Sequence, residues 1–208
     1  MAIRAFHNKL QRTDDSGFTL IELMIALTIM LLVMSAIFST FQSQSRSWVQ
    51  QQEIANMQQN LRAGMYYLER SIRMAGYDPR HSKAFGFVSN FPVPLDGFGA
   101  TTDGDDIAFT VDDDEDKVVD NNTAELVAYR RNPLTNELQF LDVSNSNTWT
   151  TVAENISSVA FTYLDEDNLV TTDPNDIRVV QITLTASSSR ASVTSTRSIT
   201  SRVRCRNI

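Results

Sequence analysis

The sequence has few of the residues that catalytic and metal sites most often use. Its 208 residues include one cysteine, Cys205, and two histidines, His7 and His81. A single cysteine excludes an internal disulfide and a cysteine-cluster zinc site. None of the G-x-S-x-G, G-x-G-x-x-G and P-loop motifs occurs. The sequence therefore predicts a protein that is not an enzyme and that needs no cofactor.

Basic residues are outnumbered by acidic ones. The chain has 18 Lys and Arg against 25 Asp and Glu, a formal net charge of -7. This balance argues against nucleic acid as a partner, because nucleic acids bind to basic faces. Hydrophobic residues make up 42% and charged residues 21% of the chain. Both values are typical of globular proteins, which excludes a wholly disordered or multi-spanning chain.

Proline is absent from residue 18 to residue 78, so a long helix can form there. Residues 18–41 read FTLIELMIALTIMLLVMSAIFSTF, with Glu22 as the one charged residue. As a helix this segment would span ~36 Å, enough to cross a hydrocarbon core of ~30 Å. The alternatives are a buried core helix and a secretory signal peptide. No A-x-A cleavage pattern follows the run, which argues against the signal peptide.

Basic residues flank the apolar run on one side. Arg4, Lys9 and Arg12 precede it, and the first basic residue after it is Arg46. The positive-inside rule therefore predicts a cytoplasmic N-terminus, with the rest of the chain across the membrane.

Glu22 is the most informative single residue of the apolar run. A carboxylate at mid-bilayer costs roughly 2.5–3.5 kcal/mol on insertion scales. No opposite charge lies within the run, so we expect its partner to be another chain or a new amine. Cleavage after Gly17 would create that amine at Phe18. The alternative is a Glu22 that lies at the membrane interface and is hydrated.

The segment Ser-Gly-Phe-Thr-Leu-Ile-Glu-Leu-Met, residues 16–24, resembles the processing signal of type IV pilins and type II secretion pseudopilins. In that family a membrane peptidase cuts after the glycine and methylates the new N-terminus. The resemblance implies cleavage between Gly17 and Phe18 and N-methylation of Phe18. It also implies that Glu22 sets the register of the subunit against the Phe18 amine of a neighbour.

A second apolar pattern follows along the same helix. One face carries apolar residues at spacings of three and four, namely Ile54, Met57, Leu61, Met65, Leu68, Ile72 and Ala75. This stripe predicts a helix from Phe18 to about Ala75, whose second half packs on the chain's own sheet. A coiled-coil dimer is the alternative, but Gln and Asn rather than charges flank the stripe.

The helix end, residues 68–77 (LERSIRMAGY), is similar to that of PilW-type minor pilins and, in layout, to J-type minor pseudopilins. The resemblance implies a minor pilin that primes or joins a type IV pilus. A J-type pseudopilin of a type II secretion system, or a single-pass membrane-anchored binding or adhesion module, is the alternative. The implied partners are other minor pilins, the major pilin, the prepilin peptidase and the inner-membrane assembly platform. The implied location is the inner membrane, with a periplasmic head, and then the filament.

The rest of the chain has the period-two pattern of strands. We expect strands at 84–88, 107–111, 125–130, 137–141, 156–164, 177–186 and 191–204. Strands after one long helix predict an α+β, pilin-like fold with a mainly antiparallel sheet. The expected organisation is a leader (1–17), a membrane half (18–41) and an amphipathic half (42–76) of one helix, and a β-rich head (77–208).

Charge is divided within the head. Residues 96–125 are strongly acidic, whereas residues 177–208 contain six arginines and no acid. The arginines either protect an exposed strand edge or dock on the acidic loop of another subunit. Asp112, Asp114 and Asp116 have the alternate spacing of a calcium loop, but Lys117 and Thr123 replace its glycine and glutamate. A structural Ca²⁺ is therefore a weak prediction here, and Asp165 with Asp167 is a weaker one.

Overall fold

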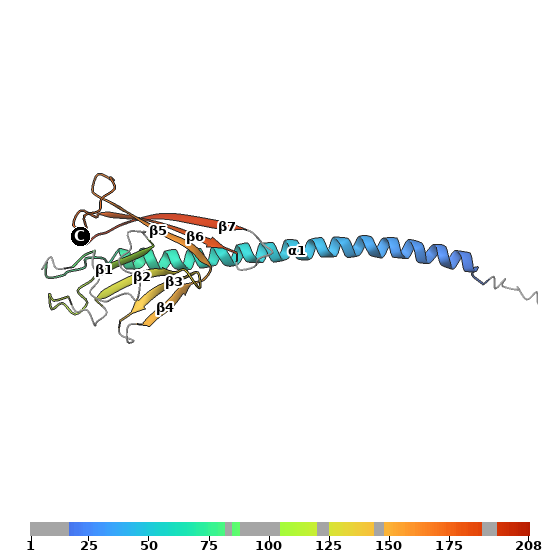
Figure 1. The fold of residues 1–208 in the computed structure, drawn as a ribbon, viewed down its shortest axis with the longest axis horizontal. Helices are drawn as coiled ribbons and strands as arrows, with labels where there is room; N and C mark the ends of the chain where they lie inside the picture. Colours follow the sequence, from blue (N-terminus) through green and yellow to red (C-terminus); the bar gives the residue numbers. More distant parts are fainter. Residues whose placement is uncertain (1–16, 82–84, 88–104, 120–124, 144–147, 189–194) are drawn as a thin grey trace, which may run out of the picture. The chain divides into compact units, whose positions relative to one another are not determined.

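A computed structural model describes residues 17–81, 85–87, 105–119, 125–143, 148–188 and 195–208. The contacts divide the chain into two compact units, Met1–Trp48 and Val49–Ile208. We refer to the second as the head unit. One helix, α1 (Leu20–Ile72), contributes to both units (Figure 1).

Helix α1 ends at the point where the sequence predicts a stop. Its last regular residue is Ile72, and single-turn hydrogen bonds continue to Ala75. Gly76 then has φ +70, and a Cβ there would lie 2.5 Å from Cγ1 of Ile208. The position therefore needs glycine both for its left-handed backbone and for the close approach of the C-terminal residue.

In the described part of the head unit, seven antiparallel strands form two sheets. The first sheet has the order β1-β2-β3-β4 and the second the order β5-β6-β7. The strands are β1 (Asp106–Thr110), β2 (Leu126–Asn132), β3 (Glu137–Asp142), β4 (Thr148–Ala153), β5 (Ile156–Leu164), β6 (Val179–Ser187) and β7 (Thr196–Arg204). The long helix with antiparallel sheets confirms the predicted α+β, pilin-like fold.

The strand predictions differ from the structure at three places. Strand β4 was not expected, because an edge strand of mostly exposed threonines lacks the apolar alternation that predicts a strand. The strand expected at 84–88 is reduced, among its described residues 85–87, to one bridge between Phe87 and Phe109. The last strand begins at Thr196, and residues 191–194 of its expected span lie outside the described part.

The core of the head unit lies between helix α1 and the two sheets. Its buried members include Met57, Leu61, Met65, Leu68 and Ile72 from the helix, and Ile54 packs against them half-buried. Figure 1 shows the two sheets on opposite sides of this part of the helix.

Gly64 lies where the helix comes closest to both sheets. A Cβ there would be 3.1 Å from Leu138 of β3 and 3.3 Å from Leu184 of β6. The absence of a side chain at this position therefore lets the helix backbone approach both sheets.

Candidate functional site

The N-terminal end of α1 is built as a capping box. The Glu22 carboxylate accepts hydrogen bonds from the backbone N–H of Thr19 (2.9 Å) and from its hydroxyl (2.8 Å). The Thr19 hydroxyl in turn accepts a bond from the Glu22 N–H at 3.4 Å. With Thr19 as N-cap and Glu22 three residues later, the two residues satisfy each other's exposed backbone donors. The carboxylate is thus held beside the first residues of the helix, where the helix dipole favours a negative charge.

This arrangement corrects one expectation from the sequence. We expected the partner of Glu22 to be another chain or the amine that cleavage creates at Phe18, but Thr19 already supplies two hydrogen bonds locally. The signal was present as Thr-x-x-Glu before an apolar run, which is a capping-box pattern. It was missed because only opposite charges were considered as partners.

The apolar half of the helix, residues 20–48, exposes its side chains all the way round and ends in a polar stretch, residues 42–47. Leu20, Leu31 and Phe38 are 77%, 71% and 62% exposed, and every residue from 17 to 48 is in the exposed class. Within the described residues, α1 is the one helix that is long and apolar enough to cross a membrane. Such a surface is stable in lipid or against other apolar helices, but not in water.

The other half of the helix is joined to the sheets by polar contacts as well as by its apolar face. The Ser71 and Tyr129 hydroxyls lie 2.7 Å apart, and Ser201 of β7 donates a hydrogen bond to Glu69. Burial raises the pKa of Tyr129, whereas the bond to Ser71 acts against the shift. Glu69 also pairs with Arg73 at 3.5 Å, four residues along the chain, a spacing that favours such pairs.

A second candidate site lies in the acidic loop, which we define as residues 112–119 between β1 and β2. Carboxylate oxygens of four residues in and beside this loop lie within 4.8 Å of one another, namely Asp112, Asp114, Asp116 and Glu125. The first three were singled out in the sequence, but Glu125 was missed because we searched only the twelfth loop position for a glutamate. That position is Thr123, which lies outside the described residues.

The backbone of the acidic loop has the turn that a calcium loop requires. Lys117 occupies the position of the usual glycine, yet its φ of 73° is in the left-handed region. Backbone N–H groups of Asp116 and Val118 donate to the carboxylates of Asp114 and Asp116, at 3.1 and 2.7 Å. The lysine therefore does not prevent the loop from folding back on itself.

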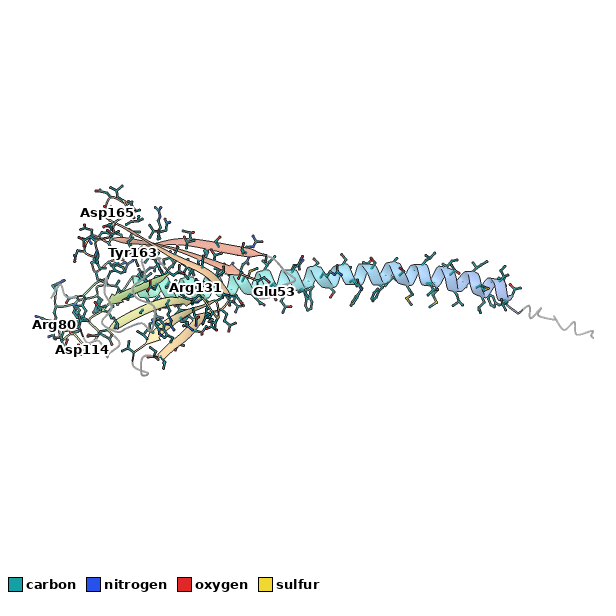
Figure 2. All side chains as sticks on the ribbon, viewed as in Figure 1. Glu53, Arg80, Asp114, Arg131, Tyr163 and Asp165 are labelled. Carbon is teal, nitrogen blue, oxygen red and sulfur yellow. The ribbon has the colours of Figure 1, made fainter. Side chains whose placement is uncertain are left out.

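Asp165 and Asp167, the weaker pair, form an ordinary turn. One oxygen of Asp165 accepts hydrogen bonds from the backbone N–H groups of Asp167 and Leu169, at 2.9 and 2.8 Å. Among the described residues, the acidic loop with Glu125 is the group of acidic side chains close enough to share an ion, and Asp165 is not part of it. Figure 2 shows Asp165 beyond the β5–β7 sheet and Asp114 at the end of the other sheet.

Two family comparisons match these two parts of the chain. The prokaryotic N-terminal methylation motif matches residues 12–38, which include the capping box and most of the apolar run. The family described as prepilin peptidase-dependent protein B matches residues 50–205, well over half of the chain. The chain belongs to the prepilin peptidase-dependent protein B family. No curated protein matches it.

Family membership fixes several properties at a coarse level. This member of the prepilin peptidase-dependent protein B family is type IV pilin-like, and its family and motif imply dependence on a prepilin peptidase. Pilin-like families consist typically of structural proteins rather than enzymes. An apolar N-terminal helix with a prepilin motif is consistent with anchoring in the inner membrane before assembly.

Proposed function

We propose that this protein is the precursor of a minor pilin, which is cut between Gly17 and Phe18, methylated on Phe18, and then primes or joins a type IV pilus. The observation that carries the proposal is the methylation-motif match over residues 12–38, placed at the start of a fully exposed apolar helix. The PilW-type resemblance of residues 68–77 supports a minor rather than a major subunit.

The local geometry around Gly17 suits a peptidase. Residues 17–19 precede the helix without regular structure, and Gly17 and Phe18 are exposed, Phe18 at 90%. A peptide bond in an exposed, non-helical segment can enter a protease active site without unfolding the helix. An added Cβ at Gly17 meets nothing within 4 Å, so a side chain there would test recognition rather than folding.

The capping box supports a role for Glu22 in assembly. Hydrogen bonds from Thr19 hold the carboxylate at the start of the helix, close to where cleavage creates the Phe18 amine. In a filament this carboxylate would pair with the Phe18 amine of a neighbouring subunit. A charge pair in a low-dielectric environment is costly to leave half-made, so it selects the register in which both charges are matched.

The proposal includes a location and a set of partners. The leader (1–17) lies in the cytoplasm, the membrane half (18–41) in the inner membrane and the head (77–208) in the periplasm, as the flanking charges predict. The partners are the prepilin peptidase, the assembly platform, other minor pilins and the major pilin. Leaving the bilayer for a bundle of pilin helices keeps the apolar half out of water throughout.

Intact mass measurement tests the processing step. The full chain is produced with and without a prepilin peptidase and extracted from membranes, and its intact mass is measured by mass spectrometry. With the peptidase we expect the loss of residues 1–17 and the gain of one methyl group on Phe18. Gly17→Val should keep residues 1–17 under the same conditions. A wild-type chain that retains Met1 beside an active peptidase would contradict the proposal.

Filament incorporation tests the assembly step separately. Glu22→Ala should be processed normally but be missing from purified filaments. Thr19→Ser, which keeps a capping hydroxyl, serves as the matched control and should be incorporated like the wild type. Normal incorporation of Glu22→Ala would show that assembly does not need this carboxylate and would contradict the role proposed for Glu22.

A further inference from the structure

We infer that the acidic loop and Glu125 form a calcium site, in which the ion fixes the β1–β2 connection to the segment that follows helix α1. The four carboxylates lie on two segments of the chain, residues 112–116 and the residue directly before β2. Their closeness alone does not define an ion site, because acidic side chains often gather on surfaces. The state of Asp112 supplies the independent observation.

The side chain of Asp112 is a buried carboxylate to which no described residue donates a hydrogen bond. Its exposed fraction is 0%, and within the described part of the chain neither of its carboxylate oxygens accepts a hydrogen bond. Buried polar groups in folded proteins are almost always paired, and an ionised group is the most costly to leave unpaired. An oxygen of Asp112 belongs to the cluster formed with Asp114, Asp116 and Glu125. A cation bound in this cluster would therefore supply the missing partner of Asp112.

The spacing of the oxygens is compatible with Ca²⁺, whose coordination geometry is less strict than that of Mg²⁺. Oxygens on opposite sides of a Ca²⁺ ion are about 4.6–5.2 Å apart, because each lies at about 2.3–2.6 Å from the ion. For Mg²⁺ the corresponding separation is only about 4.0–4.2 Å, with stricter octahedral geometry. The four oxygens lie within 4.8 Å of one another, which fits the calcium shell without contraction.

The two ends of the site differ in accessibility. Asp114 and Asp116 are exposed, whereas Asp112 and Glu125 are buried. The exposed pair would let the ion enter from solvent, and the buried pair would hold it at the base of the loop. Water molecules would complete the shell on the open side, as is usual for calcium sites with few protein ligands.

An ion at this position would act on the junction between helix and sheet. The backbone N–H of Asp112 donates to the carbonyl of Tyr77 at 2.7 Å, and Gly76 N–H donates to the carbonyl of Thr110 at 3.1 Å. Arg80, also after the helix, pairs with Glu115 at 3.8 Å (Figure 2). The acidic loop is thus attached to Tyr77 and Arg80, and β1 to Gly76, so ordering the loop would also order the segment after the helix.

A calcium titration of the full chain in detergent tests the inference. After treatment with a chelator, calorimetry should show one Ca²⁺ bound per chain, with a dissociation constant of about 10⁻⁴–10⁻³ M, the range of extracellular calcium modules. Mg²⁺ at the same concentrations should bind at least tenfold more weakly. No heat of binding at about 10 mM Ca²⁺, tenfold above that range, would overturn the inference.

Three variants separate the site from general acidity. Asp112→Asn and the exposed Asp114→Asn should each weaken Ca²⁺ binding at least tenfold. Asp113→Asn removes the same charge from the neighbouring exposed position, outside the group of four, and should change the affinity less than twofold. Equal weakening by Asp113→Asn would show diffuse attraction to an acidic surface, and the inference would be wrong.

Thermal unfolding supplies a second test, in which Ca²⁺ should reverse the order of the melting temperatures of the wild type and Asp112→Asn. In chelator, Asp112→Asn should melt at a higher temperature than the wild type, because a buried neutral amide costs less than a buried carboxylate. In saturating Ca²⁺ the wild type should melt at a higher temperature than Asp112→Asn, because only the wild type gains from binding. The same order of melting temperatures under both conditions would contradict an ion-dependent role.

Discussion

The two halves of helix α1 have the same backbone structure but opposite relations to the rest of the chain. In the apolar half, residues 20–48, apolar side chains are exposed on every side. In the other half, residues 49–72, one stripe is buried and the opposite face carries polar residues. Helix formation alone therefore does not determine where a segment ends up, since the distribution of apolar residues around the helix selects its environment.

The contrast also separates two sources of specificity. The stripe residues meet a fixed set of partners from the chain's own sheets, at distances that leave little room for a Cβ at Gly64. The apolar half contributes no residue to this core. Its first turn carries the capping box of Thr19 and Glu22, and Glu22 is the one charged residue of the apolar run. Packing therefore specifies the head unit, whereas a single carboxylate is the main specific feature available to the apolar half.

The largest expected effect comes from truncating the buried stripe. Leu68 is 0% exposed, so Leu68→Ala should lower the free energy of unfolding of the head unit by about 2–5 kcal/mol. The matched control is Leu31→Ala in the apolar half, where the side chain is 71% exposed. Urea unfolding of the full chain in detergent, followed by near-UV circular dichroism, measures both. Equal losses would show that the two halves do not differ as described.

Much of this contrast could be predicted from the sequence because it depends on local periodicity. The spacings of three and four from Ile54 to Ala75 predicted the stripe, and the apolar run with Glu22 as its one charged residue predicted the apolar half. The helix end at Gly76 followed from a glycine just before Asp78-Pro79, which is a typical stop signal.

What the sequence did not predict depends on long-range contacts. Strand β4 (TWTTVA) exists because it pairs with the edge of β3, with Thr148 opposite Asp142. Its own sequence does not indicate this, because its three apolar residues do not alternate regularly with its three threonines. Glu125 joins the acidic loop because β1 and β2 pair in a register that opposes Thr110 to Leu126. A search of the sequence for ligands at fixed spacings cannot find Glu125, because strand pairing rather than spacing places it beside the acidic loop.

A smaller effect is expected from filling the close contact at Gly64. Gly64→Val places methyl groups where a Cβ alone would already lie 3.1 Å from Leu138, so overpacking should lower the free energy of unfolding by about 1–3 kcal/mol. Ala55→Val, on the exposed face of the same half, tests the intrinsic cost of valine in a helix, which is about 0.6 kcal/mol. Urea midpoints of both variants give the comparison, and similar losses for the two would mean that the helix and sheets can separate freely.

The smallest effect concerns the interior of the head unit at alkaline pH. Burial raises the pKa of the Cys205 thiol to about 11 from its ordinary value of about 9, and nearby Arg178 opposes the shift. Because the folded state keeps the proton longer than the unfolded state, the resulting stability is complete below pH 9 and is lost as the pH rises toward 11. At pH 10 the loss should be about 1.4 kcal/mol, since each pH unit between the two pKa values costs that amount.

Urea unfolding at pH 8 and pH 10 measures this loss, with Cys205→Ala as the control. The pKa values of Tyr129 and Tyr163 are also raised by burial, so the wild type and the variant share a tyrosine-dependent loss, most of it above pH 10. Between pH 8 and pH 10 the variant should therefore lose less unfolding free energy than the wild type. The difference should equal the loss that the Cys205 thiol causes. Equal losses would mean that the Cys205 thiol is in contact with water. The head unit near the end of β7 would then be as accessible to solvent as the apolar half of the helix.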